Sequence, residues 1–358
     1  MTQPTPCSQC GNHPGIILRE YSGRIVCKGC FNREIENQVR REMARSRMLG
    51  PEDKLAFALS GGKDSVALMR IVSKIDAGLL DQQRARGLAP VAITIDEGIH
   101  DYREESIAIA AGECERLGIQ HVVFSFQQEF GHSLDEMVAL AGTGEIFQDL
   151  QEKHPSGQLK NAYKIIAKPC SICGVLRRRV LNDVAAGLGA TKLATGHHLN
   201  DEIETFLINL FKGDVNRMSR VASTTSDDED SGPFVKKIKP LQSIMQKDIV
   251  LYMYYTGGEF QDMPCPYAVD NVFRGEARHM IASLEGQHPG TLYNIRKVME
   301  TVYPLLARSP EMSSLSTCPS CGSLKSKDLA TCMPCFYVQR TCRKEYAQAM
   351  QDFLARFS

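Results

Sequence analysis

Leu55-Ala56-Phe57-Ala58-Leu59 runs directly into Ser60-Gly61-Gly62-Lys63-Asp64-Ser65, and this stretch decides the fold. The apolar run predicts a buried strand, and the glycines predict a tight turn into a helix. Adjacent glycines let backbone N–H groups approach a polyanion, which the positive end of the following helix attracts. Lys63 adds a point charge, and two serines supply hydroxyl donors. The stretch therefore predicts a phosphate-binding turn.

The spacing of this turn excludes the Walker A pattern, which requires four residues between its first Gly and the Gly-Lys pair. The turn instead resembles the PP-loop, SGGxDS, of ATP pyrophosphatases. That resemblance implies an enzyme that adenylates a substrate and releases pyrophosphate. The competing interpretation is an ordinary glycine-rich turn between a strand and a helix.

Alternating elements surround the turn. We expect strands over Leu55–Leu59, Val91–Ile95, His121–Phe126 and Lys192–Thr195, and helices over Ser65–Ile75, Glu104–Leu117, Cys173–Leu188 and Asp201–Phe211. This alternation predicts an α/β fold with a mostly parallel sheet and helices on both faces. Ser60, Asp96 and Gly196-His197 fall at strand ends, so we expect them around one ligand crevice.

The composition is that of an ordinary globular protein. The chain has 358 residues, 43% of them hydrophobic and 23% charged, with 42 basic and 42 acidic residues. No apolar run approaches the ~20 residues that span a bilayer, and the N-terminus lacks an apolar signal core. We therefore expect a cytoplasmic enzyme with no membrane partner.

Thirteen cysteines in such a chain favour metal sites over disulfides. Two Cys-x-x-Cys pairs near each end have the spacing of a closed, tetrahedral zinc site that stabilises a small domain. The predicted zinc ligands are Cys7, Cys10, Cys27 and Cys30 in the first site, and Cys318, Cys321, Cys332 and Cys335 in the second.

A third set consists of Cys170, Cys173 and the distant Cys265. Three cysteines suit an iron–sulfur cluster in which one iron lacks a protein thiolate. A redox-active Cys-x-x-Cys pair and a third zinc site with another fourth ligand are equally compatible with the spacing. Cys114 and Cys342 are expected to be small buried hydrophobic residues.

The expected organisation has five parts. They are an N-terminal zinc finger over 1–32, a linking helix over 33–50, a catalytic domain over 51–312, a second zinc finger over 313–340 and a C-terminal helix over 341–358. The charge-rich segment Glu34–Leu49 predicts an exposed helix. Ser223–Gly232 is polar and acidic, and predicts a surface loop.

The order of these motifs resembles the TtuA family of tRNA 2-thiouridine synthetases, which includes the wobble-uridine thiolases. The resemblance rests on the zinc knuckles, SGGKDS, Asp96-Glu97-Gly98, Cys170-x-x-Cys173, Thr195-Gly196-His197 with Asp201-Glu202, and Cys265-Pro266-Tyr267-Ala268. It covers nearly the whole chain. The implied substrates are tRNA and ATP.

The resemblance implies a role for each motif. ATP binds on Ser60, Gly61, Gly62, Lys63, Asp64 and Ser65, with adenosine near Asp96 and Gly98 and the far side closed by Gly196 and His197. Asp64 and Asp201 hold Mg²⁺ or orient the reacting groups. ATP adenylates the C2 oxygen of a uridine, and sulfur from a [4Fe–4S] cluster on Cys170, Cys173 and Cys265 then attacks C2.

One position departs from part of the family. Arg177 stands where TtuA-type enzymes carry a catalytic lysine, and because arginine stays charged its implied role is electrostatic. Arg177 resembles the wobble branch, whereas Cys265-Pro266-Tyr267-Ala268 and Pro289-Gly290-Thr291 resemble the T-loop branch. The modified uridine therefore stays open, as do the sulfur donor (sulfide, a cysteine desulfurase relay or a ubiquitin-like carrier) and a homodimer.

Binding to tRNA requires local cations because the net charge is zero. The candidates are Arg40, Arg41, Arg45 and Arg47, then Arg177–Arg179, and then Lys236, Lys237 and Lys239; we favour Arg177–Arg179, beside the predicted sulfur site. Two other functions remain open. One is a PP-loop enzyme that adenylates a different small acceptor, and the other is a non-catalytic zinc-knuckle protein that binds RNA.

Overall fold

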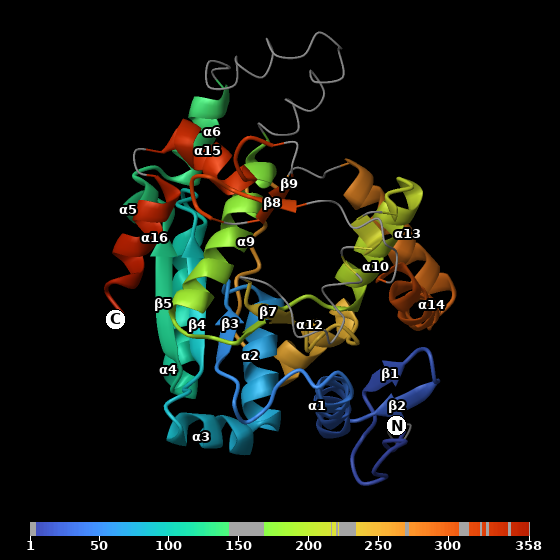
Figure 1. Ribbon diagram of the computed structural model, residues 1–358. Helices are drawn as coiled ribbons and strands as arrows, with labels where there is room; N and C mark the ends of the chain where they lie inside the picture. Colours follow the sequence, from blue (N-terminus) through green and yellow to red (C-terminus); the bar gives the residue numbers. More distant parts are fainter. Residues whose placement is uncertain are drawn as a thin grey trace.

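A five-stranded parallel sheet forms the centre of the computed structural model (Figure 1). Its strands are β3 (Leu55–Ala58), β4 (Val91–Asp96), β5 (Gln120–Ser125), β6 (Lys192–Ala194) and β7 (Lys236–Ile238), in the order β5-β4-β3-β6-β7. The structure describes residues 5–142, 168–215, 217–219, 221, 234–268, 272–307, 315–322, 324–326, 329–342 and 345–357. The predicted α/β class and its first four strands are confirmed, while β7 was not predicted.

Successive residues of the strands point to opposite faces of the sheet and enter two different cores. In β3, Leu55 and Phe57 belong to one apolar cluster and Ala56 to the other. The first face is covered by α1 (Lys28–Arg45), α2 (Lys63–Ile75), α3 (Ala77–Ala85), α4 (Arg103–Leu117) and α12 (Gln246–Tyr255). The second is covered by α5 (Phe126–Phe130), α6 (Leu134–Gly142), α9 (Pro169–Gly187), α15 (Met333–Thr341) and α16 (Tyr346–Leu354). Helices thus cover both faces, as the alternation predicts.

A third apolar cluster lies beside the sheet. It joins α10 (Leu199–Phe211), α13 (Val272–Gln287) and α14 (Thr291–Ala307), which Figure 1 shows to the right of the sheet. Leu199, Ile203 and Leu292 are fully buried or nearly so within it. The sequence predicted α10 but neither of its two partner helices.

The two cysteine-rich ends pack on opposite faces of the sheet. The N-terminal end contains the hairpin β1 (Ile17–Arg19) and β2 (Arg24–Val26), and its cysteines join the core around α1. The C-terminal end contains the hairpin β8 (Leu315–Thr317) and β9 (Leu324–Ser326), and its cysteines join the core around α9. Each cysteine-rich end therefore adds to the apolar core on one face of the sheet.

The expectation of an exposed linking helix is wrong for one side of α1. This helix begins at Lys28, and Phe31, Ile35 and Val39 on it are fully buried against α2 and α12. Apolar residues spaced at about one helical turn give the helix an inward face that its many charges obscured.

The predicted loop Ser223–Gly232 lies outside the described residues. No helix among the described residues has the length and apolar character to cross a bilayer.

A buried ion pair anchors the N-terminal knuckle to the catalytic fold. Arg19 of β1 donates two hydrogen bonds to Asp248 in the first turn of α12, at 2.6 and 3.1 Å, and both side chains are 3% exposed. The guanidinium also lies 5.2 Å from the ring centroid of Phe31. A bidentate pair with this burial fixes the orientation of the hairpin on α12.

We predict that Arg19→Ala lowers the free energy of unfolding by about 3–5 kcal/mol, because it leaves the Asp248 carboxylate buried without its partner. Arg24→Ala on the same hairpin is the control. Arg24 is 42% exposed and lies 3.4 Å from Glu34, so its loss is expected to cost about 0–1 kcal/mol. Urea unfolding of both variants, with zinc content checked first, measures the difference. Equal losses would contradict the anchoring role of Arg19.

Candidate active site and metal centres

The candidate crevice lies where the order of the strands reverses. The chain starts the sheet at β3, builds β4 and β5 on one side, and returns to place β6 and β7 on the other. The carboxyl ends of β3 and β6 are neighbours, and such a switch point is where open α/β sheets bind ligands. A cavity of about 460 Å³ opens there, with Ser60, Asp64, Gly196 and His197 among its lining residues. The predicted gathering is thus found for Ser60, Gly196 and His197, whereas Asp96 is not among the described residues that line the cavity.

The glycine turn has a backbone that only glycine allows. Gly61 has φ +78°, and a Cβ at this position would lie 2.1 Å from the carbonyl oxygen of Ser106 in α4. Ser65 closes the turn, since its hydroxyl donates to the Gly62 carbonyl at 2.9 Å and accepts from the Ser60 N–H at 3.1 Å. The turn is held from both sides before any phosphate binds.

The loop after β6 packs directly on the start of α2. A Cβ at Gly196 would lie 2.9 Å from the carbonyl carbon of Asp64, so the two loops touch through their backbones. Next to it, His197 shares a hydrogen bond of 2.9 Å with the hydroxyl of Thr195 through Nδ1. Burial lowers the pKa of His197, and the imidazole is therefore neutral at pH 7.

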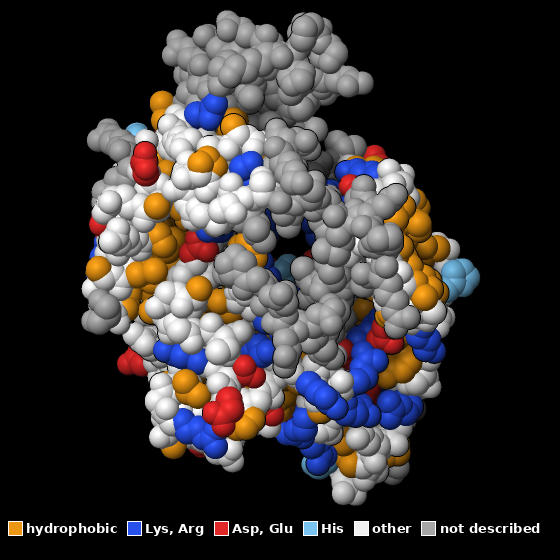
Figure 2. All heavy atoms as spheres, viewed as in Figure 1, with side chains coloured by type: hydrophobic (Ala, Val, Ile, Leu, Met, Phe, Trp, Pro, Cys, Tyr) orange, Lys and Arg blue, Asp and Glu red, His pale blue; other side chains and the backbone are white. Residues whose placement is uncertain are grey.

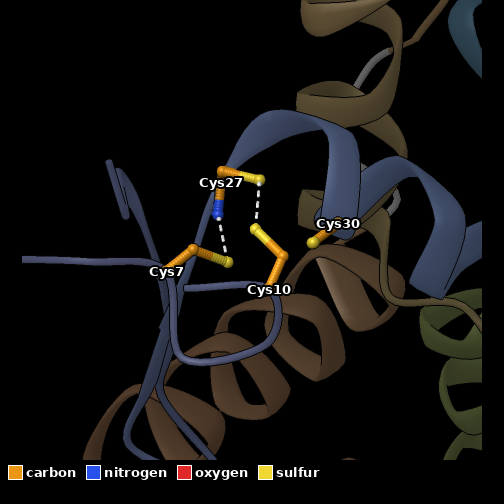
Figure 3. Close-up of side chains that lie close together, drawn as sticks. All are labelled: Cys7, Cys10, Cys27 and Cys30. Atoms are coloured by element: carbon orange, nitrogen blue, oxygen red, sulfur yellow. Dashed lines mark hydrogen bonds between the residues drawn. The ribbon is translucent and has the colours of Figure 1, made fainter. Parts of the chain in front are cut away.

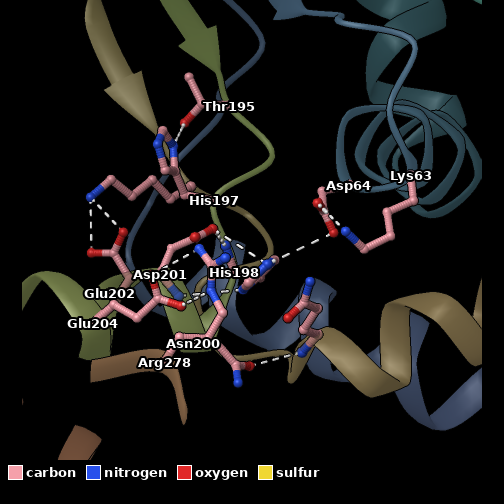
Figure 4. Close-up of polar contacts among 12 residues, drawn as sticks. Lys63, Asp64, Thr195, His197, His198, Asn200, Asp201, Glu202, Glu204 and Arg278 are labelled. Carbon is pink, nitrogen blue, oxygen red and sulfur yellow. Dashed lines mark hydrogen bonds and ion pairs between the residues drawn. The ribbon is translucent and has the colours of Figure 1, made fainter. Parts of the chain in front are cut away.

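Two carboxylates and a histidine meet at this contact (Figure 4). His198 Nε2 lies 3.9 Å from Asp64 Oδ1 and 3.4 Å from Asp201 Oδ2. His198 and Asp201 also form a capping box at the start of α10, which fixes both side chains. The buried Oδ1 of Asp64 has no hydrogen-bond partner among the described residues. Oxygen atoms placed in this way fit a hard cation such as Mg²⁺.

Asn200 makes a different contact from that of its neighbour Asp201. Its side-chain oxygen accepts a hydrogen bond of 2.9 Å from the backbone N–H of Gln246, at the start of α12. Figure 4 shows Asn200 pointing away from Asp64. Asp201, which lies beside His198 together with Asp64, is therefore the residue of this pair placed toward Asp64.

A second, smaller cavity extends the crevice toward the unassigned cysteines. It has a volume of about 130 Å³, and Ser60 and Gly62 line it together with Cys173 and Cys265. The segment before Cys265 is tied to the glycine turn, because Gln261 N donates to the Gly61 carbonyl at 3.0 Å. The structure thus brings the phosphate turn and two of the three cysteines to one space.

The three cysteines come from two segments. Cys170 and Cys173 occupy the first turn of α9, and the Cys170 thiol donates to the Tyr267 carbonyl at 3.1 Å, two residues after Cys265. Cys170 is exposed, and the other two are half-buried. The three do not form a set as compact as the zinc sites. Their sulfur atoms do not all lie within 4.8 Å of one another, in contrast to those of the two terminal sets.

Glu97 is a site residue that the sequence analysis passed over. Its carboxylate is buried, lying 2.9 Å from Arg103 Nε, 3.6 Å from Arg177 Nη1 and 3.9 Å from Cys173 Sγ. Burial, with the negative charge of Glu97, raises the pKa of Cys173 to about 12. The sequence signal that could have identified Glu97 is its position directly after a buried strand, between Asp96 and Gly98.

Asp96 and Gly98 hold Glu97 in its turn. Asp96 Oδ1 accepts from Gly98 N at 2.9 Å, and Gly98 has φ +67°. Ile95 and Glu97, their neighbours, line the crevice. The assignment of Asp96 and Gly98 to adenosine stays a prediction. In the glycine turn, Lys63 pairs with Asp64 at 3.1 Å.

The two terminal cysteine sets have the geometry of single-ion sites. Within each, the sulfur atoms all lie within 4.8 Å of one another. Figure 3 shows the side chains of Cys7, Cys10, Cys27 and Cys30 gathered at one point. The other set is Cys318, Cys321, Cys332 and Cys335. In both sets a backbone N–H donates a hydrogen bond to the sulfur of the first cysteine. The Cys27 N–H donates to Cys7 Sγ at 3.2 Å, and the Cys332 N–H donates to Cys318 Sγ at 3.3 Å. These closed sets of four thiols fit tetrahedral zinc.

A glycine turn at the switch point of a parallel sheet places the chain among α/β enzymes of the PP-loop type. No family model matches the chain. It is 32% identical to the tRNA 2-thiolation protein NcsA of Haloferax volcanii, over 93% of this chain and 98% of the relative. It is 30% identical to the cytoplasmic tRNA 2-thiolation protein 1 of Chlamydomonas reinhardtii, over 94% and 85%.

A solved structure agrees with these relatives. The U34-tRNA thiolase NcsA from Methanococcus maripaludis, determined with its [4Fe-4S] cluster, superposes with a TM-score of 0.72 at 29% identity, covering 96% of this chain and 99% of that one. The chain belongs to the family of tRNA 2-thiolation proteins. The predicted function, 2-thiolation of tRNA by a sulfurtransferase, is confirmed at this level.

We predict that Gly61→Ala abolishes ATP binding, because a methyl group 2.1 Å from the Ser106 carbonyl must displace either the turn or α4. Gly112→Ala in α4 is the control, since no atom lies within 4 Å of its added methyl. That variant is expected to gain about 0.5–1 kcal/mol in stability and to bind ATP normally. Calorimetric titration with ATP compares the two, and normal affinity in Gly61→Ala would contradict the close approach.

We predict that Glu97→Gln lowers the pKa of the Cys173 thiol in metal-free protein. Removing the negative charge 3.9 Å from Sγ favours the thiolate, so alkylation begins at lower pH. The rate of iodoacetamide labelling of Cys173 against pH, read by mass spectrometry, measures the shift. Cys114 is the internal control, because its pKa of about 12 is raised mainly by burial. A shift shared by both thiols would indicate loosened structure instead.

Proposed function

We propose that this chain converts the wobble uridine of tRNA to 2-thiouridine by adenylating its C2 oxygen with ATP and replacing that oxygen with sulfur. The observation that carries the proposal is the continuity between the phosphate turn and the cysteine cavity. Ser60, Glu97, Arg103 and Arg177 line both spaces. A uridine placed there meets the nucleotide on one side and the cysteines on the other.

The overall change is redox-neutral. The C2 oxygen of uridine attacks the α-phosphorus of ATP, and pyrophosphate leaves. Sulfide then forms a bond to C2, the C2–O bond breaks, and the oxygen departs with AMP. The first step turns a carbonyl oxygen into a good leaving group, without which the uracil ring resists substitution.

Residues of the chain divide this work between them. The Gly61-Gly62 turn and the N-terminus of α2 would hold the phosphates, with Lys63 as an added charge. Asp64 and Asp201 would hold Mg²⁺, since both carboxylates face the contact between the two loops. Arg103 and Arg177, both anchored by Glu97, present positive charge where the pyrophosphate and the adenylated oxygen develop negative charge.

Cys170, Cys173 and Cys265 would be the ligands of a [4Fe–4S] cluster, and the remaining cysteine sets would each hold zinc. When bound, such a cluster supplies an iron that lacks a protein thiolate and can hold the sulfur to be transferred. Arg177, one helical turn after Cys173 on α9, lines both the cysteine cavity and the crevice. Because its guanidinium stays protonated, its role is to orient and stabilise charge.

The wobble position is favoured over the T-loop by the structural neighbour, which is a U34-tRNA thiolase. The names of the eukaryotic relatives support a cytoplasmic location. With this uridine the chain would belong to the wobble branch of the TtuA group. The proposal keeps three candidate sulfur donors (sulfide, a cysteine desulfurase relay or a ubiquitin-like carrier), a homodimer, and the division into five parts at residues 32, 50, 312 and 340.

We predict that Cys265→Ala loses iron and thiolation but keeps ATP affinity and zinc. Anaerobically reconstituted protein is incubated with ATP, Mg²⁺, sulfide and unmodified tRNA, and the digested product is mapped by mass spectrometry. The wild type is expected to place 2-thiouridine at the wobble position. Cys342→Ala, a half-buried thiol outside the three sets, is the control and is expected to keep iron and activity.

Either of two results would overturn the proposal. Full thiolation by Cys265→Ala would exclude the three-cysteine centre. Failure of the wild type to thiolate any tRNA, with iron present and ATP bound, would indicate that another acceptor is adenylated.

A further inference from the structure

A separate cavity lies between α9 and the C-terminal knuckle, and we name it the knuckle cavity. It has a volume of about 360 Å³. Its charged lining residues among those that the structure describes are Arg178, Arg179, Lys237 and Lys325, and none of the described lining residues is a carboxylate. Leu329 and Met333 of the knuckle form an apolar part of the wall. The combination of four cations with an apolar wall suits a polyanion that also carries apolar surface.

The knuckle cavity adjoins the candidate active site. Arg178 and Lys237 line both the knuckle cavity and the 460 Å³ crevice, from α9 and β7 respectively. Figure 2 shows the molecule hollowed in this central region, between the elements that Figure 1 labels α9 and α10. A chain of phosphates entering the crevice can therefore continue along the same wall to the knuckle.

The charge of Arg178 and Lys237 is not neutralised within the described part of the chain. Neither side chain has a hydrogen bond or an ion pair there, whereas Arg179 is paired with Asp183 at 2.6 Å. Burial and neighbouring cations lower the pKa of Lys237 and of Arg178. Two adjacent unpaired cations in partly desolvated positions repel each other, and an incoming anion relieves that repulsion.

A larger basic groove elsewhere is lined by carboxylates as well as cations. It has a volume of about 930 Å³ and lies between the N-terminal knuckle, α1 and α14, near the basic patch at the lower right of Figure 2. Its Arg45 and Arg296 pair with Glu42 and Glu300, and its Arg24 pairs with Glu34. Carboxylates within the groove thus offset part of its positive charge, whereas Arg40, Arg41 and Lys297 line it without an ion pair among the described residues.

We propose that the knuckle cavity binds backbone phosphates of the tRNA nucleotides next to the uridine in the crevice, with Arg178 and Lys237 as the contacts. This proposal rests on the proposed function, since it takes tRNA as the substrate. It assigns the C-terminal knuckle a role in substrate binding: its apolar wall faces the sugar and base while α9 and β7 face the phosphates. ATP binds at the glycine turn and is not the occupant of the knuckle cavity.

The test compares Arg178→Ala and Lys237→Ala with Lys297→Ala, an exposed lysine of the other groove with no ion pair among the described residues. The affinity of the full-length protein for fluorescently labelled, unmodified tRNA is measured without ATP, between about 50 and 200 mM salt. Zinc content verifies the fold, and the affinity for ATP is measured separately. Lys237→Arg tests whether charge alone restores binding.

Each variant of the knuckle cavity is expected to weaken tRNA binding about fivefold to tenfold near 0.1 M salt and to reduce the slope of log affinity against log salt by about 0.7–0.9. Lys297→Ala and Lys237→Arg are expected to bind like wild type. Unchanged tRNA binding with weakened ATP binding would overturn the proposal and assign the two cations to ATP. An equal loss in Lys297→Ala would also overturn it, by showing that overall charge governs binding. Absence of thiolation alongside these binding results would count against the proposed function alone.

Discussion

The site depends on two places where backbone touches backbone. At Gly61 the carbonyl oxygen of Ser106 occupies the space of a side chain, and at Gly196 the backbone of Asp64 does the same. These contacts hold the ends of β3 and β6 against the start of α2, at the edge of one crevice. In the proposed function, the position of a bound phosphate is set by chain geometry that is fixed before binding. The carboxylates Asp64 and Asp201 meet only because these loops are in contact.

The topology then decides what else reaches the crevice. Reversal of the strand order at β3 sends the chain away through β4 and β5 and back through α9, whose first turn carries Cys170 and Cys173. Cys265 arrives on a segment that is hydrogen-bonded to Gly61 through Gln261. A main-chain hydrogen bond therefore ties the segment that carries Cys265 to the glycine turn. The two cysteine knuckles lie outside this contact and stabilise opposite faces.

Local signals in the sequence were sufficient for elements whose pattern is short and self-contained. The apolar run before SGGKDS, the paired Cys-x-x-Cys spacings and the strand-to-helix alternation each reflect one local constraint, and the structure confirms the strands and the compact cysteine sets. The inward face of α1 was missed because its charges outnumber its apolar residues. Glu97 was missed because its partners, Arg103, Arg177 and Cys173, become neighbours only through tertiary packing. Likewise, only the fold shows that Asn200 caps α12 while Asp201 faces Asp64.

The net charge of the chain is another property whose consequences depend on tertiary packing. A net charge of zero argues against a nucleic-acid partner when charges are counted along the chain. In the described part of the folded protein the acids are distributed unevenly. Glu42 and Glu300 neutralise arginines beside α1 and α14, whereas no described carboxylate lines the cavity beneath the C-terminal knuckle. What attracts a polyanion is the local excess that remains after internal pairing, because paired cations contribute little field beyond a Debye length. A neutral chain can thus present a strongly basic cavity next to its active site, and pairing in the fold, more than composition, determines where RNA can bind.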